Sequence, residues 1–107
     1  MRTKDCRDCD AQIVWASHHA RGSRMPFDAD PLRPEEIQRH GQWFLVPDGE
    51  GVTAYPAAKI EPQAYGLDPT EVYVSHFATC PGPRGRADFS RMEPALRLRR
   101  ERYARRR

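Results

Sequence analysis

Cys6-Arg-Asp-Cys9 and His76-Phe-Ala-Thr-Cys80 decide how this chain folds, because these two stretches contain every cysteine of the sequence and one of its four histidines. Cysteine and histidine in closely spaced pairs are the ligands that tetrahedral Zn²⁺ takes, at about 2.0–2.3 Å. A site closed by four protein ligands stabilises a fold and leaves no open position for catalysis. We therefore predict a structural Zn²⁺ site, with the ligands Cys6, Cys9, His76 and Cys80.

The two ligand pairs lie far apart in the chain. Between Cys9 and His76 there are 66 residues, whereas the pairs of a Cys2His2 finger are about 12–15 residues apart. The site is therefore expected to clamp two distant parts of a sheet. His18 or His19 could replace His76 as the fourth ligand, although both fall in a polar segment typical of a turn. A redox role for the CxxC pair is disfavoured because a strand-like run follows it, and buried thiols without a metal are the remaining alternative.

Bulk properties indicate one small domain with a thin core. The chain has 107 residues, 38% of them apolar, and ten prolines, so a metal would compensate for limited burial. No apolar run approaches the roughly 18 residues of a membrane span, and the first residues lack the apolar centre of a secretory signal. We expect a cytoplasmic protein, where an odd number of cysteines favours thiolate ligands over disulfides.

Charge is distributed unevenly along the chain. Residues 1–83 carry eight Lys/Arg and twelve Asp/Glu, a net −4, whereas residues 84–107 carry ten Arg and three acids, a net +7. We predict a β domain over 1–83 and an Arg-rich helical or flexible tail over 84–107. An appended basic segment of this kind most often meets a polyanion such as nucleic acid.

Short extended pieces dominate the first 83 residues. Runs rich in β-branched and aromatic residues, bounded by turn signals, predict strands. Pro26 restricts its strand to a sheet edge, and Asp10, directly after the CxxC pair, suits a left-handed backbone position. One helical turn is expected at 34–36 and another at His76–Cys80, where a four-residue spacing places both ligands on one face. The expected strands are 11–17, 24–28, 42–46, 52–55 and a half-buried 71–75, with a short one at 59–60.

A helix is predicted after the joint at 81–86. Ser90 and Glu93 form a capping box, and Pro94 falls within the first turn, where its missing N–H does little harm. An apolar stripe along this helix would be a docking face, formed by Met92, Ala95, Leu96 and Tyr103.

The segments CRDCDAQIVWA, SRMPFDADP and YVSHFATCP resemble the small zinc-ribbon-like proteins of actinobacteria and their phages. The resemblance covers about the first 83 residues, and its ligand positions fall on the two pairs quoted above. It implies a metal-held β fold with contacts to nucleic acid or the transcription machinery, and it names no activity. The expected fold class is thus a small β-rich zinc-ribbon-like domain with a basic C-terminal α-helix.

The predicted function is non-catalytic nucleic-acid binding, with no membrane and no small-molecule substrate as partner. His40 is a loop residue rather than a general base, and no phosphate loop, nucleophile elbow or HExxH motif occurs. An adaptor that docks on a larger assembly, such as an RNA polymerase, a nuclease or a virion component, is the alternative. The sequence does not separate DNA from RNA. The candidate phosphate-binding residues are Arg84, Arg86, Arg91, Arg97, Arg99, Arg100, Arg102, Arg105, Arg106 and Arg107, and the candidate stacking residues are Trp15, Trp43, Phe44 and Tyr55.

Overall fold

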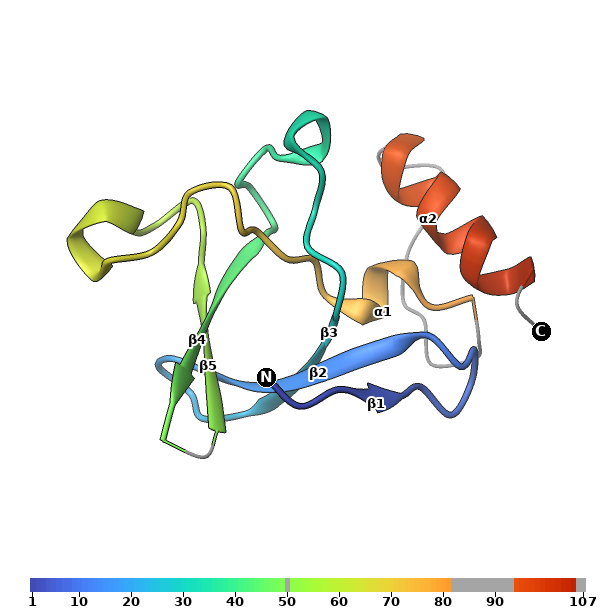
Figure 1. Cartoon of the computed structure of the whole chain (residues 1–107), viewed down its shortest axis with the longest axis horizontal. Coiled ribbons are helices and arrows are strands. Elements are labelled where there is room, and N and C mark those ends of the chain that lie inside the picture. Colours follow the sequence, from blue (N-terminus) through green and yellow to red (C-terminus); the bar gives the residue numbers. More distant parts are fainter. Residues whose placement is uncertain (50, 82–93, 106–107) are drawn as a thin grey trace.

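A curved β-sheet, with one α-helix laid across its end, organises the chain in the computed structural model (Figure 1), which describes residues 1–49, 51–81 and 94–105. The strand order is β1-β2-β5-β4, and β3 pairs with the other side of β2. The predicted β-rich class with a C-terminal helix is confirmed. The strands are β1 (Lys4–Asp5), β2 (Gln12–His18), β3 (Arg24–Asp28), β4 (Trp43–Asp48) and β5 (Gly51–Pro56).

The β2–β3 hairpin separates two environments. Its antiparallel register pairs Ile13 with Asp28 and Trp15 with Pro26, and residues opposite one another share a face of the sheet. Ile13 packs in a cluster with the cysteines, whereas Val14, the next residue, packs in the main apolar core. Alternate residues of β2 therefore pack into the apolar core, and the residues between them pack against the cysteine cluster.

The strands expected at 42–46 and 52–55 are also present, and they form a hairpin that is longer than expected. β4 and β5 pair from Trp43↔Pro56 to Asp48↔Gly51, so the strands continue into what the sequence suggested was turn. Gly49 supplies the turn with a positive φ of 62°, which glycine adopts without steric cost. β5 then lies parallel to the end of β2, through Ser17↔Thr53 and His18↔Ala54.

The extended segment 72–75 closes the sheet on itself. Its backbone bonds to β4 through Trp43 and Tyr73, at 2.9 and 2.8 Å, and to β3 through Asp28 N and Val74 O, at 3.1 Å. The predicted half-buried strand at 71–75 is thus only a pair of isolated bridges. Val72, Tyr73 and Val74 are all buried, because the segment has one apolar cluster on each side. The expected alternation fails for that reason.

Short helical elements connect the strands. η1 (Pro34–Glu36) and α1 (His76–Thr79) lie where single helical turns were predicted. The short strand expected at 59–60 is wrong: this stretch is a turn, in which the Lys59 amide donates to the Pro56 carbonyl at 3.1 Å. η2 (Pro62–Tyr65) follows it and was not expected.

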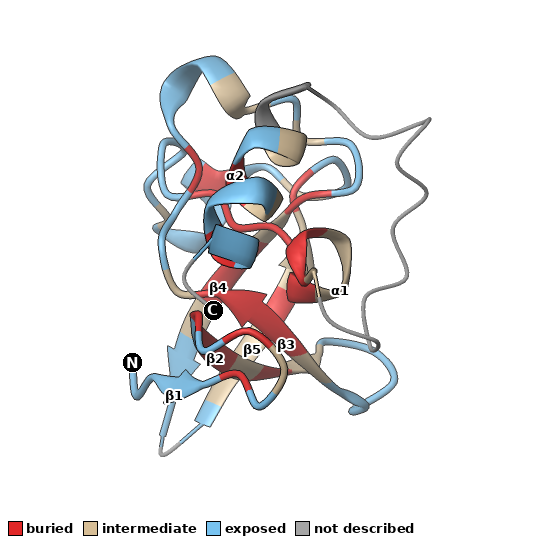
Figure 2. Ribbon diagram, turned by 90° about the vertical axis from the view of Figure 1, so that its right-hand side faces the viewer, coloured by how far each residue is buried: buried red, intermediate tan, exposed pale blue. Residues whose placement is uncertain are grey.

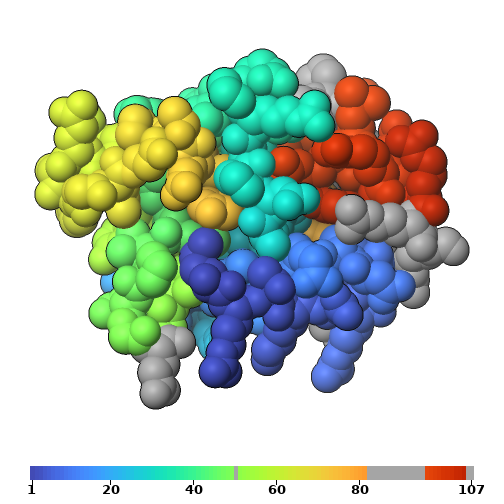
Figure 3. Space-filling model, viewed as in Figure 1, coloured from blue at the N-terminus to red at the C-terminus, as the bar shows by residue number. Residues whose placement is uncertain are grey.

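The C-terminal helix α2 (Pro94–Arg105) packs against the domain and does not extend from it as a tail. Its residues Arg99 and Tyr103 are buried against the domain. Leu96, also on α2, packs against the cluster around Phe44 and Val72. Figure 2 shows this end of the sheet covered by α1 and α2, and Figure 3 shows α2 beside the segment that contains η1. The predicted cap at Ser90, Met92 of the stripe and the joint at 82–86 lie outside the described residues. No helix described here has the length and apolar character that a membrane crossing requires.

Candidate metal centre

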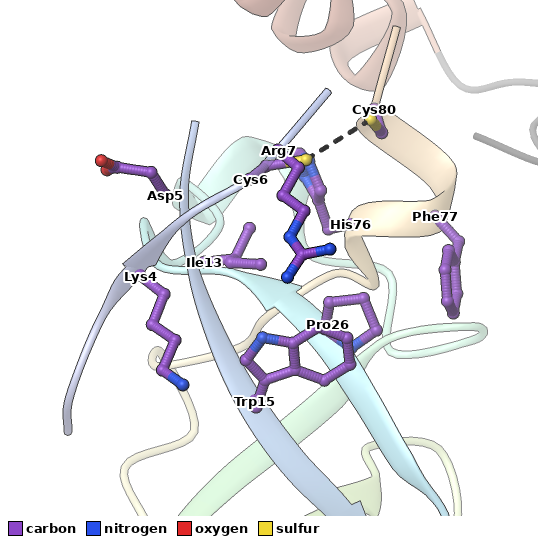
Figure 4. A pocket seen from close by; sticks show the side chains of 10 residues that line it. All are labelled: Lys4, Asp5, Cys6, Arg7, Ile13, Trp15, Pro26, His76, Phe77 and Cys80. Atoms are coloured by element: carbon purple, nitrogen blue, oxygen red, sulfur yellow. Dashed lines mark hydrogen bonds between the residues drawn. The ribbon is translucent and has the colours of Figure 1, made fainter. Parts of the chain in front are cut away.

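The four predicted ligands meet at one buried point. Cys6, Cys9, His76 and Cys80 are all buried, and their ligand atoms lie within 4.8 Å of one another. Cys6 Sγ is 3.8 Å from Cys80 Sγ, as drawn in Figure 4, and Cys9 Sγ is 3.3 Å from His76 Nε2. The cluster is therefore compatible with a metal site.

These separations between ligand atoms fit tetrahedral coordination of one ion better than a disulfide. Two thiolates bound to one Zn²⁺ at about 2.3 Å, with a tetrahedral angle between them, are about 3.8 Å apart, and a thiolate and an imidazole nitrogen are about 3.6 Å apart. A disulfide needs a sulfur separation of about 2.05 Å, and all three cysteines are free thiols. The two separations of 3.8 and 3.3 Å are thus close to those of ligands that share one cation.

The first ligand pair is held by a tight turn. The Cys6 amide donates to Ala11 O at 2.8 Å, and the Asp10 amide donates to Cys6 O at 2.9 Å. The Asp8 amide points at Cys6 Sγ from 3.4 Å, so a backbone donor already faces the sulfur that would carry negative charge. Asp10 has a φ of 62°, which confirms the predicted left-handed position.

The second ligand pair stands on α1. Ser75 caps this helix, because its hydroxyl accepts from the Phe77 amide at 3.2 Å. The Cys80 amide donates to His76 O at 2.8 Å, which places the two side chains one helical turn apart on the same face, as predicted. The segment 72–75, closed into the sheet, delivers this turn to the CxxC pair.

Asp28 orients the histidine and was not predicted as part of the site. Its Oδ1 lies 2.6 Å from His76 Nδ1 and accepts from Thr79 Oγ1 at 2.7 Å, and the carboxylate has no solvent exposure. A proton on Nδ1 held by this carboxylate leaves the Nε2 lone pair facing Cys9. Carboxylate–histidine pairs of this kind fix the ring of metal-binding histidines and make the imidazole a stronger ligand.

Arg99 completes the charge balance, and its place corrects one sequence prediction. Its guanidinium is buried, and donates to Asp28 Oδ2 at 3.3 Å, Asp30 O at 2.9 Å and Pro31 O at 3.1 Å. Glu36 lies 3.6 Å from the same group. A guanidinium with these partners is not available to a phosphate, so Arg99 is structural. Arg99 lies one helical turn before Tyr103, and both side chains are buried.

Tyr103 covers the histidine from α2. The two rings meet edge to face with 5.7 Å between centroids. Burial, followed by the nearby Asp28 carboxylate, raises the pKa of Tyr103 well above its usual range. For His76, burial alone lowers the pKa, but the hydrogen bonds and charges of Asp28 and Cys6 together outweigh burial and raise it. Residues from β3, α1 and α2 thus form one network behind the ligands.

The thiols of Cys6 and Cys9 differ in acidity. Burial by itself raises the pKa of Cys6, but amide hydrogen bonds from Asp8 and Cys9, together with side-chain hydrogen bonds to His76 and Cys9, outweigh burial and lower it. Burial, together with the charges of Cys80 and Cys6, raises the pKa of Cys9 to about 12. Several adjacent thiolates are unstable without a cation, and a divalent metal reverses that balance.

The remaining predicted ligands lie elsewhere. His18 and His19 stack on each other with 4.7 Å between centroids, and His18 Nδ1 accepts from the amides of Ala20 and Arg21, each at 3.1 Å. Both histidines are absent from the cysteine cluster, so the expectation that one of them could replace His76 is not met.

Candidate nucleic-acid residues are divided between the surface, the interior and the part of the chain that is not described. Arg102 and Arg105 are exposed on α2, and Arg97 and Arg100 are half-buried. Phe44 is buried in the core, and Trp43 packs against Phe27. Trp15 is half-buried beside the cysteine cluster, and Tyr55 stacks on His19. The candidates outside the described residues are Arg84, Arg86, Arg91, Arg106 and Arg107.

The network behind the ligands left little trace in the sequence. Thr79 could have been inferred from its place in the ligand turn, one residue before Cys80, because a hydroxyl there can reach the same partner as His76. Asp28 lies 48 residues from His76, and no local pattern links the two.

Comparison with known proteins yields no relative. The chain matches no protein-family model, and neither curated proteins nor solved structures match it. The resemblance to zinc-ribbon-like proteins therefore stays a prediction.

Proposed function

We propose that the cluster binds a structural Zn²⁺ through Cys6, Cys9, His76 and Cys80, as in a zinc-ribbon-like domain. Three thiols and one imidazole are the donor set that Zn²⁺ takes in closed structural sites. The separations of 3.8 and 3.3 Å support tetrahedral coordination, and the Asp28 carboxylate supplies the outer-shell contact such sites use. When bound, the ion neutralises the thiolates and joins the CxxC turn to α1.

We further propose that the protein is a non-catalytic nucleic-acid-binding module. The observation that carries this function is the charge contrast between residues 84–107, at +7, and residues 1–83, at −4. Among the arginines on the described helix α2, Arg99 alone is fully buried, and Arg102 and Arg105 face solvent. Exposed guanidinium groups match phosphate oxygens in geometry and charge.

Salt dependence tests this proposal. Affinity for labelled single-stranded DNA, single-stranded RNA and duplex DNA is measured by fluorescence anisotropy at increasing salt. Replacing both Arg102 and Arg105 by Gln should reduce the slope of log K against log[salt] by about 0.7–0.9 for each phosphate that the variant no longer neutralises. The matched control is Arg21→Gln with Lys59→Gln, which removes the same charge from exposed residues elsewhere. No binding at low salt, or an equal reduction in the control, would overturn the proposal.

A protein-interaction adaptor is the second candidate, and one observation favours it. Leu98 on α2 is 60% exposed, beside a groove whose rim carries both Arg33 and Glu35. An exposed leucine with charges of both signs around it suits a protein surface better than a phosphate backbone. Leu98→Ser that abolishes co-purification of a partner, without changing nucleic-acid affinity, would favour this function.

A further inference from the structure

A cavity of about 390 Å³ opens beside the cysteine cluster, between the CxxC turn, the β2–β3 hairpin and α1 (Figure 4). This volume lies within the about 300–1,000 Å³ that small-ligand sites span. Trp15 and Pro26 line one side, Phe77 lines another, and Cys6 and Cys80 border it. The cavity thus occupies the metal-facing side of the hairpin, away from the apolar core.

The apolar wall presents an aromatic face. Trp15 is half-buried and sits opposite Pro26 in the register of the hairpin. The guanidinium of Arg24, which does not line the cavity, lies 5.9 Å from the centre of the indole ring, a distance at which a cation is attracted to the ring face. A planar group that enters the cavity can therefore lie against an indole whose position is fixed by the sheet.

The rim of the cavity is basic. Lys4 and Arg7 line the cavity and are exposed. Figure 4 shows the Arg7 side chain reaching from the CxxC turn toward Trp15. Asp5 is the acid among the lining residues, and it accepts a hydrogen bond from Gln12 and points away from the indole. Arg7 stands between two metal ligands, so the same turn that would hold the ion also places this cation over the cavity.

We propose that this cavity binds one nucleotide of single-stranded nucleic acid, with the base against Trp15 and its phosphate between Lys4 and Arg7. The inference rests on the proposed nucleic-acid function and names the surface that would distinguish single strands from duplexes. Bases in a duplex are stacked on each other and cannot reach an indole, whereas unpaired bases stack on aromatic side chains in a sequence-tolerant way. An acidic peptide matches the cations but has no planar group to meet the indole.

Tryptophan fluorescence tests the contact directly. The chain has two tryptophans, and Trp43→Phe leaves Trp15 as the only indole. A short oligodeoxythymidylate or oligouridylate should quench that emission, and a duplex of equal length at equal concentration should quench it much less. Binding that leaves Trp15 emission unchanged would overturn the proposal.

Substitution at the wall separates stacking from general attraction. Measured by anisotropy, Trp15→Leu should weaken binding of the same oligonucleotides about tenfold, and Trp15→Phe should retain most of the affinity. Metal content and the circular dichroism spectrum show whether each variant is folded. If Trp15→Leu binds as tightly as the unmodified chain, the cavity proposal fails while the nucleic-acid function stands.

Substitution at the rim provides a test that does not disturb the core. Lys4→Gln and Arg7→Gln, both at exposed positions, should each reduce the salt slope for single strands by about 0.7. Arg21→Gln, an exposed cation that does not line the cavity, is the matched control and should have a smaller effect. Equal effects of the three substitutions would overturn the proposal, as would tighter competition by an acidic peptide than by a mononucleotide. Absence of all nucleic-acid binding would remove both proposals.

Discussion

At the end of the domain where α1 packs against β3, the buried groups include thiols, an imidazole, a carboxylate and a guanidinium, whereas the β4 side buries Phe44, Val72 and Leu32. The second set gains stability simply by leaving water, at about 25 cal/mol per Å² of apolar surface. The first set gains nothing from burial alone, because each polar group needs a partner there. Asp28 and Arg99 satisfy part of that need, and the proposed cation would satisfy the thiols.

This contrast explains how a chain with 38% apolar residues and ten prolines forms a defined domain. The apolar clusters are assembled from short strands and a single closing segment, 72–75. That segment leads directly into the turn carrying His76 and Cys80. A metal at the cluster would therefore hold closed the same segment that completes the apolar core.

The largest expected effect is at the ligands. Cys80→Ser should abolish stoichiometric zinc and lower the free energy of unfolding by about 4 kcal/mol or more, because metal-binding energy is folding energy in such sites. Metal analysis of the purified protein and thermal unfolding measure the two quantities. A variant that lacks metal and is as stable as the unmodified protein would remove the role of the ion in the fold.

The next largest effect is expected in the apolar cluster, at the end of the domain away from the cysteines. Phe44 is 1% exposed in the cluster with Val72, so Phe44→Ala should cost about 3–5 kcal/mol through reduced transfer energy and a cavity. The folded fraction should still bind one zinc per chain, because no ligand is changed. Denaturant unfolding and metal content are the measurements, and release of metal from folded protein would show that the two ends are not separable.

A smaller effect is expected behind the ligands. Asp28→Asn leaves the shape of the site but weakens the hold on His76 and leaves Arg99 without its buried charge partner. Zinc affinity should fall about 10–100-fold, measured by competition with a chelating dye. Asp30→Asn, an exposed neighbour whose backbone carbonyl is unchanged, is the control. Equal affinities in the two variants would contradict the outer-shell role.

The smallest effect is expected at Asp68, an exposed residue outside the candidate metal centre. Hydrogen bonds from the Thr70 hydroxyl and amide lower the pKa of Asp68. A carboxyl whose pKa is lower in the folded state contributes stability above its unfolded pKa of about 3.9 and loses it as pH falls through the folded pKa. Asp68→Asn should therefore remove a small acid-dependent part of stability. The free energy of unfolding of both proteins is measured from neutral to acid pH. The same pH dependence in the two proteins would contradict this prediction.

Sequence alone was enough for the parts of the fold that depend on local signals. The hairpin partners of β2 and β4, the left-handed position at Asp10 and the helical turn between His76 and Cys80 each follow from residues within a few positions of one another. The four candidate ligands were recognisable as a set because few other residue types offer thiolate and imidazole donors.

Tertiary structure decided the rest, because the deciding interactions join residues that no local pattern relates. Asp28 meets His76 across 48 residues and Arg99 across 71, which turned a predicted phosphate-binding arginine into a structural one. Closure of the segment 72–75 between two apolar clusters removed the expected alternation. Local signals in the sequence determined which polar and charged side chains the chain can offer. The tertiary structure determined which of them find hydrogen-bond partners inside the protein and which remain at the surface for a partner.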